Sequence, residues 1–104
     1  MKFCLITTTL SPHQMPLAHC LVKCVGAENF RYIAVDPLNV ARVALGWDGT
    51  GLLPWTLQPA NRQQDREEAG WWSENADVVL SGIRSVRLFK RRCQSGKVTL
   101  YMSE

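Results

Sequence analysis

A single imidazole lies in a short polar segment near the start of the chain. The segment Ser11-Pro12-His13-Gln14 follows Lys2 to Thr9, which is short, apolar and β-rich and predicts a buried strand. Imidazole titrates near neutral pH, and a loop at the carboxyl end of a strand can direct it into a cleft. His13 is therefore a candidate general base, with Ser11 and Gln14 as candidate substrate-binding residues. The alternative is that His13 only caps the following helix or lies exposed.

A second polar turn, Ser81-Gly82, follows the compact apolar stretch Asp77 to Leu80. In open parallel sheets, ligands bind beyond the carboxyl ends of the strands, near the point where the strand order reverses. Ser81 and Gly82 are therefore candidate substrate-binding residues as well. The glycine-rich dinucleotide-binding motif and the P-loop motif are both absent, and we expect no cofactor.

Six cations and no acid occupy the fourteen residues from Arg84 to Lys97. The simplest interpretation is a solvated helix face. The alternative is contact with phosphate or with an anionic lipid surface. The candidates for that contact are Arg84, Arg87, Lys90 and Arg91. We expect no nucleic-acid partner, because no aromatic residues are interleaved with the cations as a stacking platform.

The four cysteines do not form a recognisable metal-binding pattern. Cys4, Cys20, Cys24 and Cys93 show no CxxC spacing and no histidine at finger-like spacing. Cys20 and Cys24 are four residues apart and could form one edge of a metal site on a helix. Free cysteine usually packs as a small apolar residue, however. We therefore predict core filling and no metal.

The N-terminus does not match an export signal, although Lys2 precedes an apolar stretch. The polar residues from Ser11 to Gln14 would interrupt the apolar core of such a signal, and His19 fits poorly just before a cleavage site. We expect a cytoplasmic protein, in which the cysteines are reduced.

The composition fits one globular domain. The chain has 104 residues, of which 46% are hydrophobic and 20% charged, with a formal net charge of +3. These values argue against disorder, and the length suffices for one core. No apolar run approaches the roughly 18–20 residues needed to cross a bilayer.

The order of predicted elements indicates the fold class. Strands are predicted at 2–9, 30–35, 77–81 and 98–102, with a short extended piece at 55–57, and helices at 14–25, 38–45, 60–76 (interrupted by Gly70) and 83–93. Strands that alternate with helices indicate right-handed crossovers and a parallel sheet covered on both faces. We predict one α/β, Rossmann-like domain over residues 1–104, with three α/β/α layers.

The chain ends at Ser103-Glu104, just after the last predicted strand, where a doubly wound domain would normally continue. The sequence therefore suggests an incomplete domain. We expect an apolar flank on the last strand, with Tyr101 and one of Trp71 and Trp72 exposed. Such a patch favours self-association.

Several segments together resemble a known family. They are Ser11 to Ala18, Phe30 to Ile33, Gly46-Trp47, Ala76 to Gly82 and Gly96 to Glu104. In this order they resemble bacterial GT-B-type glycosyltransferases, in which a first strand is followed by Ser-Pro-His-Gln-x-Pro-Leu-Ala. The resemblance covers nearly the whole chain. It implies the N-terminal, acceptor-side domain of such an enzyme.

The resemblance implies that His13 acts as general base on a hydroxyl acceptor. The sugar would come from a nucleotide-sugar donor bound by a second Rossmann-like domain, so the 104-residue chain alone would be inactive. Bacterial enzymes of this kind often act on lipid-linked acceptors, which implies peripheral contact with the inner membrane face. The alternative, from a different class, is a non-catalytic α/β binding module whose basic helix contacts phosphate, anionic lipid or acidic partners.

Overall fold

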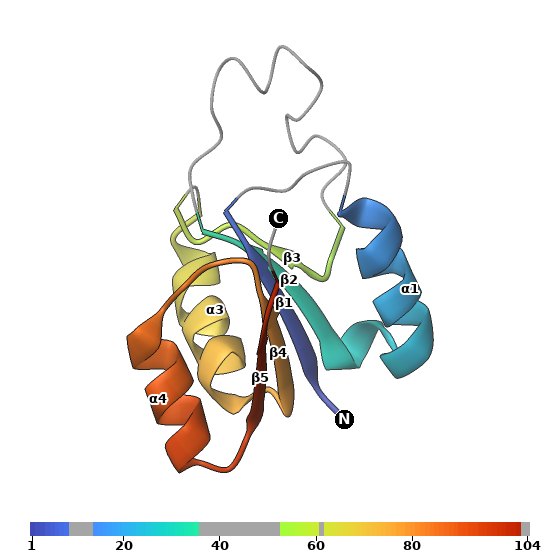
Figure 1. Cartoon of the computed structure of the whole chain (residues 1–104). Helices are drawn as coiled ribbons and strands as arrows, with labels where there is room; N and C mark the ends of the chain where they lie inside the picture. Colours follow the sequence, from blue (N-terminus) through green and yellow to red (C-terminus); the bar gives the residue numbers. More distant parts are fainter. Residues whose placement is uncertain (9–13, 36–52, 61, 103–104) are drawn as a thin grey trace.

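The computed structural model describes residues 1–8, 14–35, 53–60 and 62–102 (Figure 1). Five strands form one sheet in the order β3-β2-β1-β4-β5, and every neighbouring pair is parallel. The strands are β1 (Phe3–Thr7), β2 (Phe30–Ala34), β3 (Thr56–Leu57), β4 (Val78–Ser81) and β5 (Val98–Tyr101). The predicted α/β fold with a parallel sheet is confirmed.

The helices begin and end at residues whose backbone chemistry favours these positions. They are α1 (Met15–Val25), the 3-10 helix η1 (Ala27–Asn29), α3 (Gln64–Asn75) and α4 (Val86–Gln94). Pro16 lies in the first turn of α1, where its missing N–H leaves no hydrogen bond unmade. Gly26 ends α1 with φ of 91°, and its N–H donates to Val22 O at 2.8 Å. The Ser85 hydroxyl caps α4 by accepting from Leu88 N at 3.3 Å.

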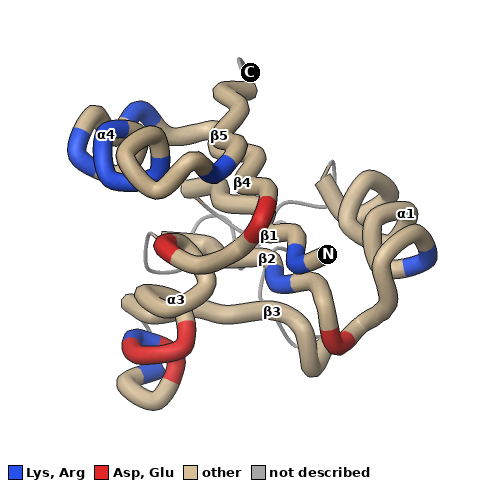
Figure 2. The backbone as a smooth tube through the Cα atoms, turned by 90° about the horizontal axis from the view of Figure 1, so that it is seen from below, with Lys and Arg blue, Asp and Glu red and all other residues tan. Residues whose placement is uncertain are grey.

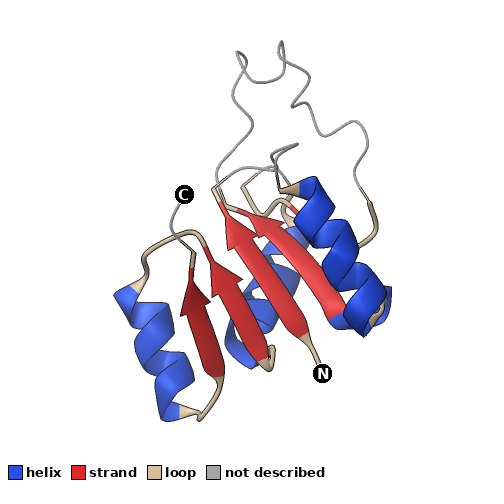
Figure 3. Ribbon diagram, turned by 45° about the vertical axis from the view of Figure 1, so that its right-hand side comes forward, coloured by secondary structure: helices blue, strands red, loops and turns tan. Residues whose placement is uncertain are grey.

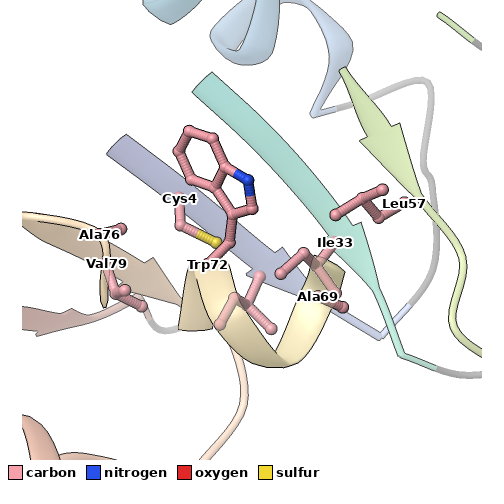
Figure 4. Packing of buried hydrophobic residues seen from close by; sticks show 8 residues of the cluster. Cys4, Ile33, Leu57, Ala69, Trp72, Ala76 and Val79 are labelled. Atoms are coloured by element: carbon pink, nitrogen blue, oxygen red, sulfur yellow. The ribbon is translucent and has the colours of Figure 1, made fainter. Parts of the chain in front are cut away.

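Helices pack on both faces of the sheet (Figure 3). On one face, Leu5 and Tyr32 pack with Ala18 of α1 in a buried cluster. On the other face, Cys4 and Val79 pack with Trp72 of α3 in a second cluster, which Figure 4 shows from close by. Because β1 and β2 are buried on both faces, they consist of nearly continuous apolar runs rather than alternating ones.

Some predicted boundaries and burials differ from the structure. The helix expected from residue 83 begins at Val86, because Ser85 provides its N-cap. The helix expected at 60–76 begins at Gln64 and runs through Gly70, which has no neighbouring atom near the position of a Cβ. The helix expected at 38–45 lies outside the described residues.

The prediction that the cysteines fill the core is correct for one of them only. Cys4 is fully buried, whereas Cys20, Cys24 and Cys93 are exposed. The reason lies in the helical positions. The buried side of α1 carries Ala18, with partly buried leucine and valine side chains beside it, and the two cysteines of α1 lie outside that stripe.

The face of the sheet opposite α4 is uncovered along β5. Val98 and Leu100 are each 51% exposed, and they continue the rows formed by Val78 and Leu80 of β4. The aromatic exposures match the expectation, because Tyr101 (47%) and Trp71 (48%) are exposed and Trp72 is buried.

Candidate functional site at the carboxyl end of the sheet

The strand order reverses between β1 and β4. From β1 the chain proceeds outward through β2 to β3, then returns to the other side of β1 for β4 and continues outward to β5. In parallel sheets with such a reversal, ligands bind in a crevice outside the carboxyl ends of the two strands, here β1 and β4. These ends lie side by side, since Ile6 is in register with Ser81 and Gly82 N donates to Ile6 O at 2.8 Å.

Ser81 and Gly82 lie at the carboxyl end of β4, beside the end of β1. The Ser81 side chain is buried, donates to Ile83 O at 2.8 Å and accepts from Ile83 N at 3.1 Å. Its hydroxyl therefore holds the turn after β4, and the Gly82 amide holds that turn against β1. A contact of either residue with substrate stays a prediction.

Gln14 immediately precedes α1. Its carbonyl accepts from Ala18 N at 3.0 Å, and its side chain, half-buried, makes no capping hydrogen bond. Ser11 and His13 lie outside the described residues, as does Asp36, which the sequence does not connect to His13. The structure thus describes the strand ends on either side of the proposed crevice and one of the three candidates from the first loop.

Buried polar groups near the same edge of the sheet were missed by sequence reasoning. Thr7, the last residue of β1, donates from Oγ1 to Tyr32 Oη at 3.0 Å in a buried pair. After β3, the buried Asp65 carboxylate accepts from Gln58 N and from Arg62 Nε, each at 2.8 Å. The sequence contains one signal for this contact, because Asp65 follows Arg62 by three residues at the start of a helix, a spacing at which opposite charges can pair. These bonds fix the carboxyl ends of β1 and β3.

The cations of α4 and its preceding loop gather on one side of the molecule (Figure 2). Arg84, Arg87, Lys90 and Arg91 are all exposed. The Arg84 guanidinium lies 5.3 Å from the centre of the Tyr101 ring, and Arg91 forms an ion pair with Glu74. Among the described residues, no ion pair involves Arg87 or Lys90.

Arg92 belongs to the core rather than to this surface. It is 1% exposed, and its three nitrogens donate to Thr99 Oγ1 (2.6 Å), Val98 O (2.7 Å) and Ser73 O (3.1 Å). No carboxylate pairs with it in the described part of the chain. Desolvation by burial lowers the pKa of the Arg92 guanidinium from its ordinary value.

The surroundings of two other titrating groups, Cys4 and Asp77, shift their pKa values. Burial raises the pKa of the Cys4 thiol to about 12, although the nearby charge of Arg92 acts in the opposite direction. The backbone amide of Lys2 donates to Asp77 Oδ2 at 2.7 Å and lowers the pKa of that carboxyl. Both groups lie far from the carboxyl edge of β1 and β4, so they are structural features and not candidates for catalysis.

The described residues contain neither a metal-ligand cluster nor a membrane-spanning element. No group of three or more His, Cys, Asp or Glu residues is placed to hold a metal ion there. None of the helices described has the length and apolar character that crossing a bilayer requires.

Comparisons with protein-family models, with curated proteins and with solved structures found no match for this chain.

Proposed function

We propose that this chain forms the N-terminal, acceptor-side domain of a GT-B-type glycosyltransferase. Such an enzyme transfers a sugar from a nucleotide-sugar donor to a hydroxyl acceptor. The observation that supports the proposal is the adjacency of β1 and β4 at the reversal of strand order, with Gly82 N bonded to Ile6 O. The segment containing Ser11 and His13 follows β1 in the chain, so it leaves the sheet at the edge where ligands of such folds bind.

In this proposal His13 removes the proton from the acceptor hydroxyl as that oxygen attacks the sugar, and the bond from the sugar to the phosphate of the nucleotide breaks, so that the nucleotide leaves. A general base works best when its pKa lies near the operating pH, which an imidazole satisfies without a perturbing neighbour. Ser11, Gln14, Ser81 and Gly82 would border the acceptor. The donor would bind to a second Rossmann-like domain outside the 104 residues, and the 104-residue chain alone would have no transferase activity.

The proposal is tested by joining residues 1–104 to the coding sequence that follows Glu104 in the genome. The longer polypeptide should transfer sugar from a panel of nucleotide-sugar donors to hydroxyl acceptors, and the 104-residue chain should not. A reading frame that stops at Glu104, or a longer protein whose added part lacks nucleotide-sugar binding, would contradict the proposal.

A second candidate function is supported by the exposed cations of α4. Arg87 and Lys90 lie beside Val86, which is one of the most exposed apolar side chains described. Cations next to an exposed apolar residue fit contact with an anionic lipid surface, where each cation contributes about 1 kcal/mol. The chain would then act as a non-catalytic module that binds phosphate or anionic lipid, at the cytoplasmic face of the membrane. Salt-sensitive binding of anionic vesicles by the 104-residue chain alone would favour this function.

A further inference from the structure

A groove between α4 and β5 plays no part in the proposed transferase function. It encloses about 550 Å³ and is lined by Phe89, Cys93, Gly96, Lys97, Thr99 and Tyr101. It lies at the edge of the sheet, because β5 is the last strand and pairs with β4 alone among the described strands. An edge strand beside a helix is the arrangement that accepts an additional strand from another polypeptide.

The backbone of β5 offers hydrogen-bonding groups at this edge. Val98 N donates to Asp77 O at 3.3 Å and Met102 N to Ser81 O at 2.7 Å, so these amides point toward β4. Successive residues of a strand turn their N–H and C=O groups to opposite sides. The backbone N–H and C=O groups of Thr99 and Tyr101 therefore point to the free edge, where each residue offers one donor and one acceptor.

The same two residues line the groove with their side chains. Thr99 Oγ1 is bonded to Arg92 of α4, which fixes this face of β5 toward the helix. A strand added at the free edge would direct alternate side chains into the groove, against Phe89 and Cys93. Its other side chains would lie beside Leu100 on the uncovered face. The added segment must therefore be apolar on both faces.

The charges around the groove determine which residues flank that apolar segment. Lys97 lines the groove, and the Arg84 guanidinium lies over the ring of Tyr101. No Asp or Glu is among the residues that line it. Acidic residues at the ends of an added strand would meet these cations, which favours both affinity and the rate of association.

A second copy of the chain fits this edge less well. Two β5 strands that pair antiparallel about a two-fold axis place both α4 helices on one face of the joined sheet. Lys97, just before β5 in each copy, would then approach Arg84, which lies over Tyr101 at the end of the other copy's β5, and like charges brought together oppose the contact.

From these observations we infer that the edge of β5 binds an extended, apolar polypeptide segment flanked by acidic residues. The segment pairs with the backbone of Thr99 and Tyr101 and fills the groove beneath α4. The groove lies at the edge strand and not where β1 and β4 end, so failure of the transferase proposal would leave this inference standing.

The test uses the 104-residue chain and a fluorescent peptide of the sequence Glu-Glu-Val-Phe-Val-Glu. Fluorescence anisotropy should show saturable binding, which weakens with salt and is at least roughly tenfold weaker when the three acids are replaced by lysine. A peptide N-methylated at alternate residues, so that it cannot donate to the edge, should not bind. The double variant Arg84→Glu with Lys97→Glu should reverse the preference between the acidic and the basic peptide.

The control is Lys23→Glu, a charge reversal at an exposed position on α1 with half the charge change of the double variant, which should leave the preference unchanged. Circular dichroism melting shows whether each variant is folded. Equal binding of the N-methylated peptide, or no binding of the acidic peptide up to about 1 mM, would overturn the inference. So would a dimer in sedimentation that Tyr101→Pro dissociates, because the occupant of the edge would then be a second copy.

Discussion

Arg92 Nε donates to Thr99 Oγ1 at 2.6 Å and thereby joins the inner side of α4 to β5. Arg92 is buried without a carboxylate partner among the described residues, so its stabilising effect depends on three hydrogen bonds to neutral groups. Lysine cannot reproduce the planar arrangement of donors that these three acceptors require. The bond also holds Thr99, which lines the groove in which we infer that the apolar segment binds.

We expect Arg92→Lys to lower the free energy of unfolding by about 2–3 kcal/mol, because it leaves buried acceptors unpaired. Arg91→Lys is the matched control, since Arg91 is half-exposed and pairs with an equally exposed Glu74. The Arg91→Lys substitution should change the free energy of unfolding by less than about 0.5 kcal/mol. Urea unfolding of the two variants measures the difference, and equal midpoints would show that the buried bonds contribute nothing.

The sequence alone could not distinguish Arg92 from the cations beside it by residue type. The available signal was position, since Arg92 is four residues after Leu88, which packs against the core. The alternation of strands and helices was enough to predict the parallel sheet, because apolar strands of this kind need cover on both faces. The strand order was not predictable, because it depends on contacts between residues far apart in sequence. His13 could be selected by its chemistry, by its place after a strand and by the resemblance of its segment to a known pattern.

The four thiols should differ in reactivity according to burial. A thiol reagent should modify Cys20, Cys24 and Cys93 rapidly in the native protein and Cys4 only on unfolding, because Cys4 is fully buried. Mass spectrometry of the labelled peptides assigns each site. Rapid labelling of Cys4 in protein that still shows a native circular dichroism spectrum would contradict the packing of β1.

Cys4 also makes stability depend on pH. The pKa of its thiol in the folded protein, about 12, lies above the ordinary thiol value. The contribution of the buried thiol to the free energy of unfolding is therefore fully present below that ordinary value and is lost as pH rises toward 12. Between pH 7 and pH 10 the parent should lose about 2 kcal/mol that Cys4→Ala does not lose, given an unfolded pKa near 8.5. Parallel pH dependences in the two proteins would exclude this linkage.

The uncovered face of β4 and β5 should make the chain self-associate. We expect dimers or larger species at concentrations on the order of tens of micromolar, through the exposed Val98 and Leu100. Leu100→Glu should shift sedimentation toward monomer, whereas Val86→Glu, at an isolated exposed position on α4, should not. A parent chain that sediments as a monomer at several hundred micromolar (roughly tenfold higher) would contradict this prediction.

Binding to anionic vesicles should depend on the exposed face of α4. Replacing Arg87, Lys90 and Arg91 together with glutamine should lower binding at least tenfold, because each cation contributes about 1 kcal/mol near an anionic surface. Lys23→Gln, an exposed cation on α1, is the control and should have little effect. If the triple variant and the parent float equally with vesicles, the exposed cations of α4 form a solvated helix face and do not bind lipid.

The proposed role of His13 as general base is tested by the turnover of a His13→Gln variant, made in the proposed longer polypeptide with a donor-binding domain. Glutamine keeps a polar side chain but cannot accept the proton, so kcat should fall by about 10²–10⁴-fold with little change in stability. His19→Gln is the matched control, because His19 is an exposed residue of α1 whose ring packs edge-on against Trp55, and it should keep kcat near that of the parent. Turnover of the His13→Gln enzyme within about threefold of the parent would show that His13 is not the general base.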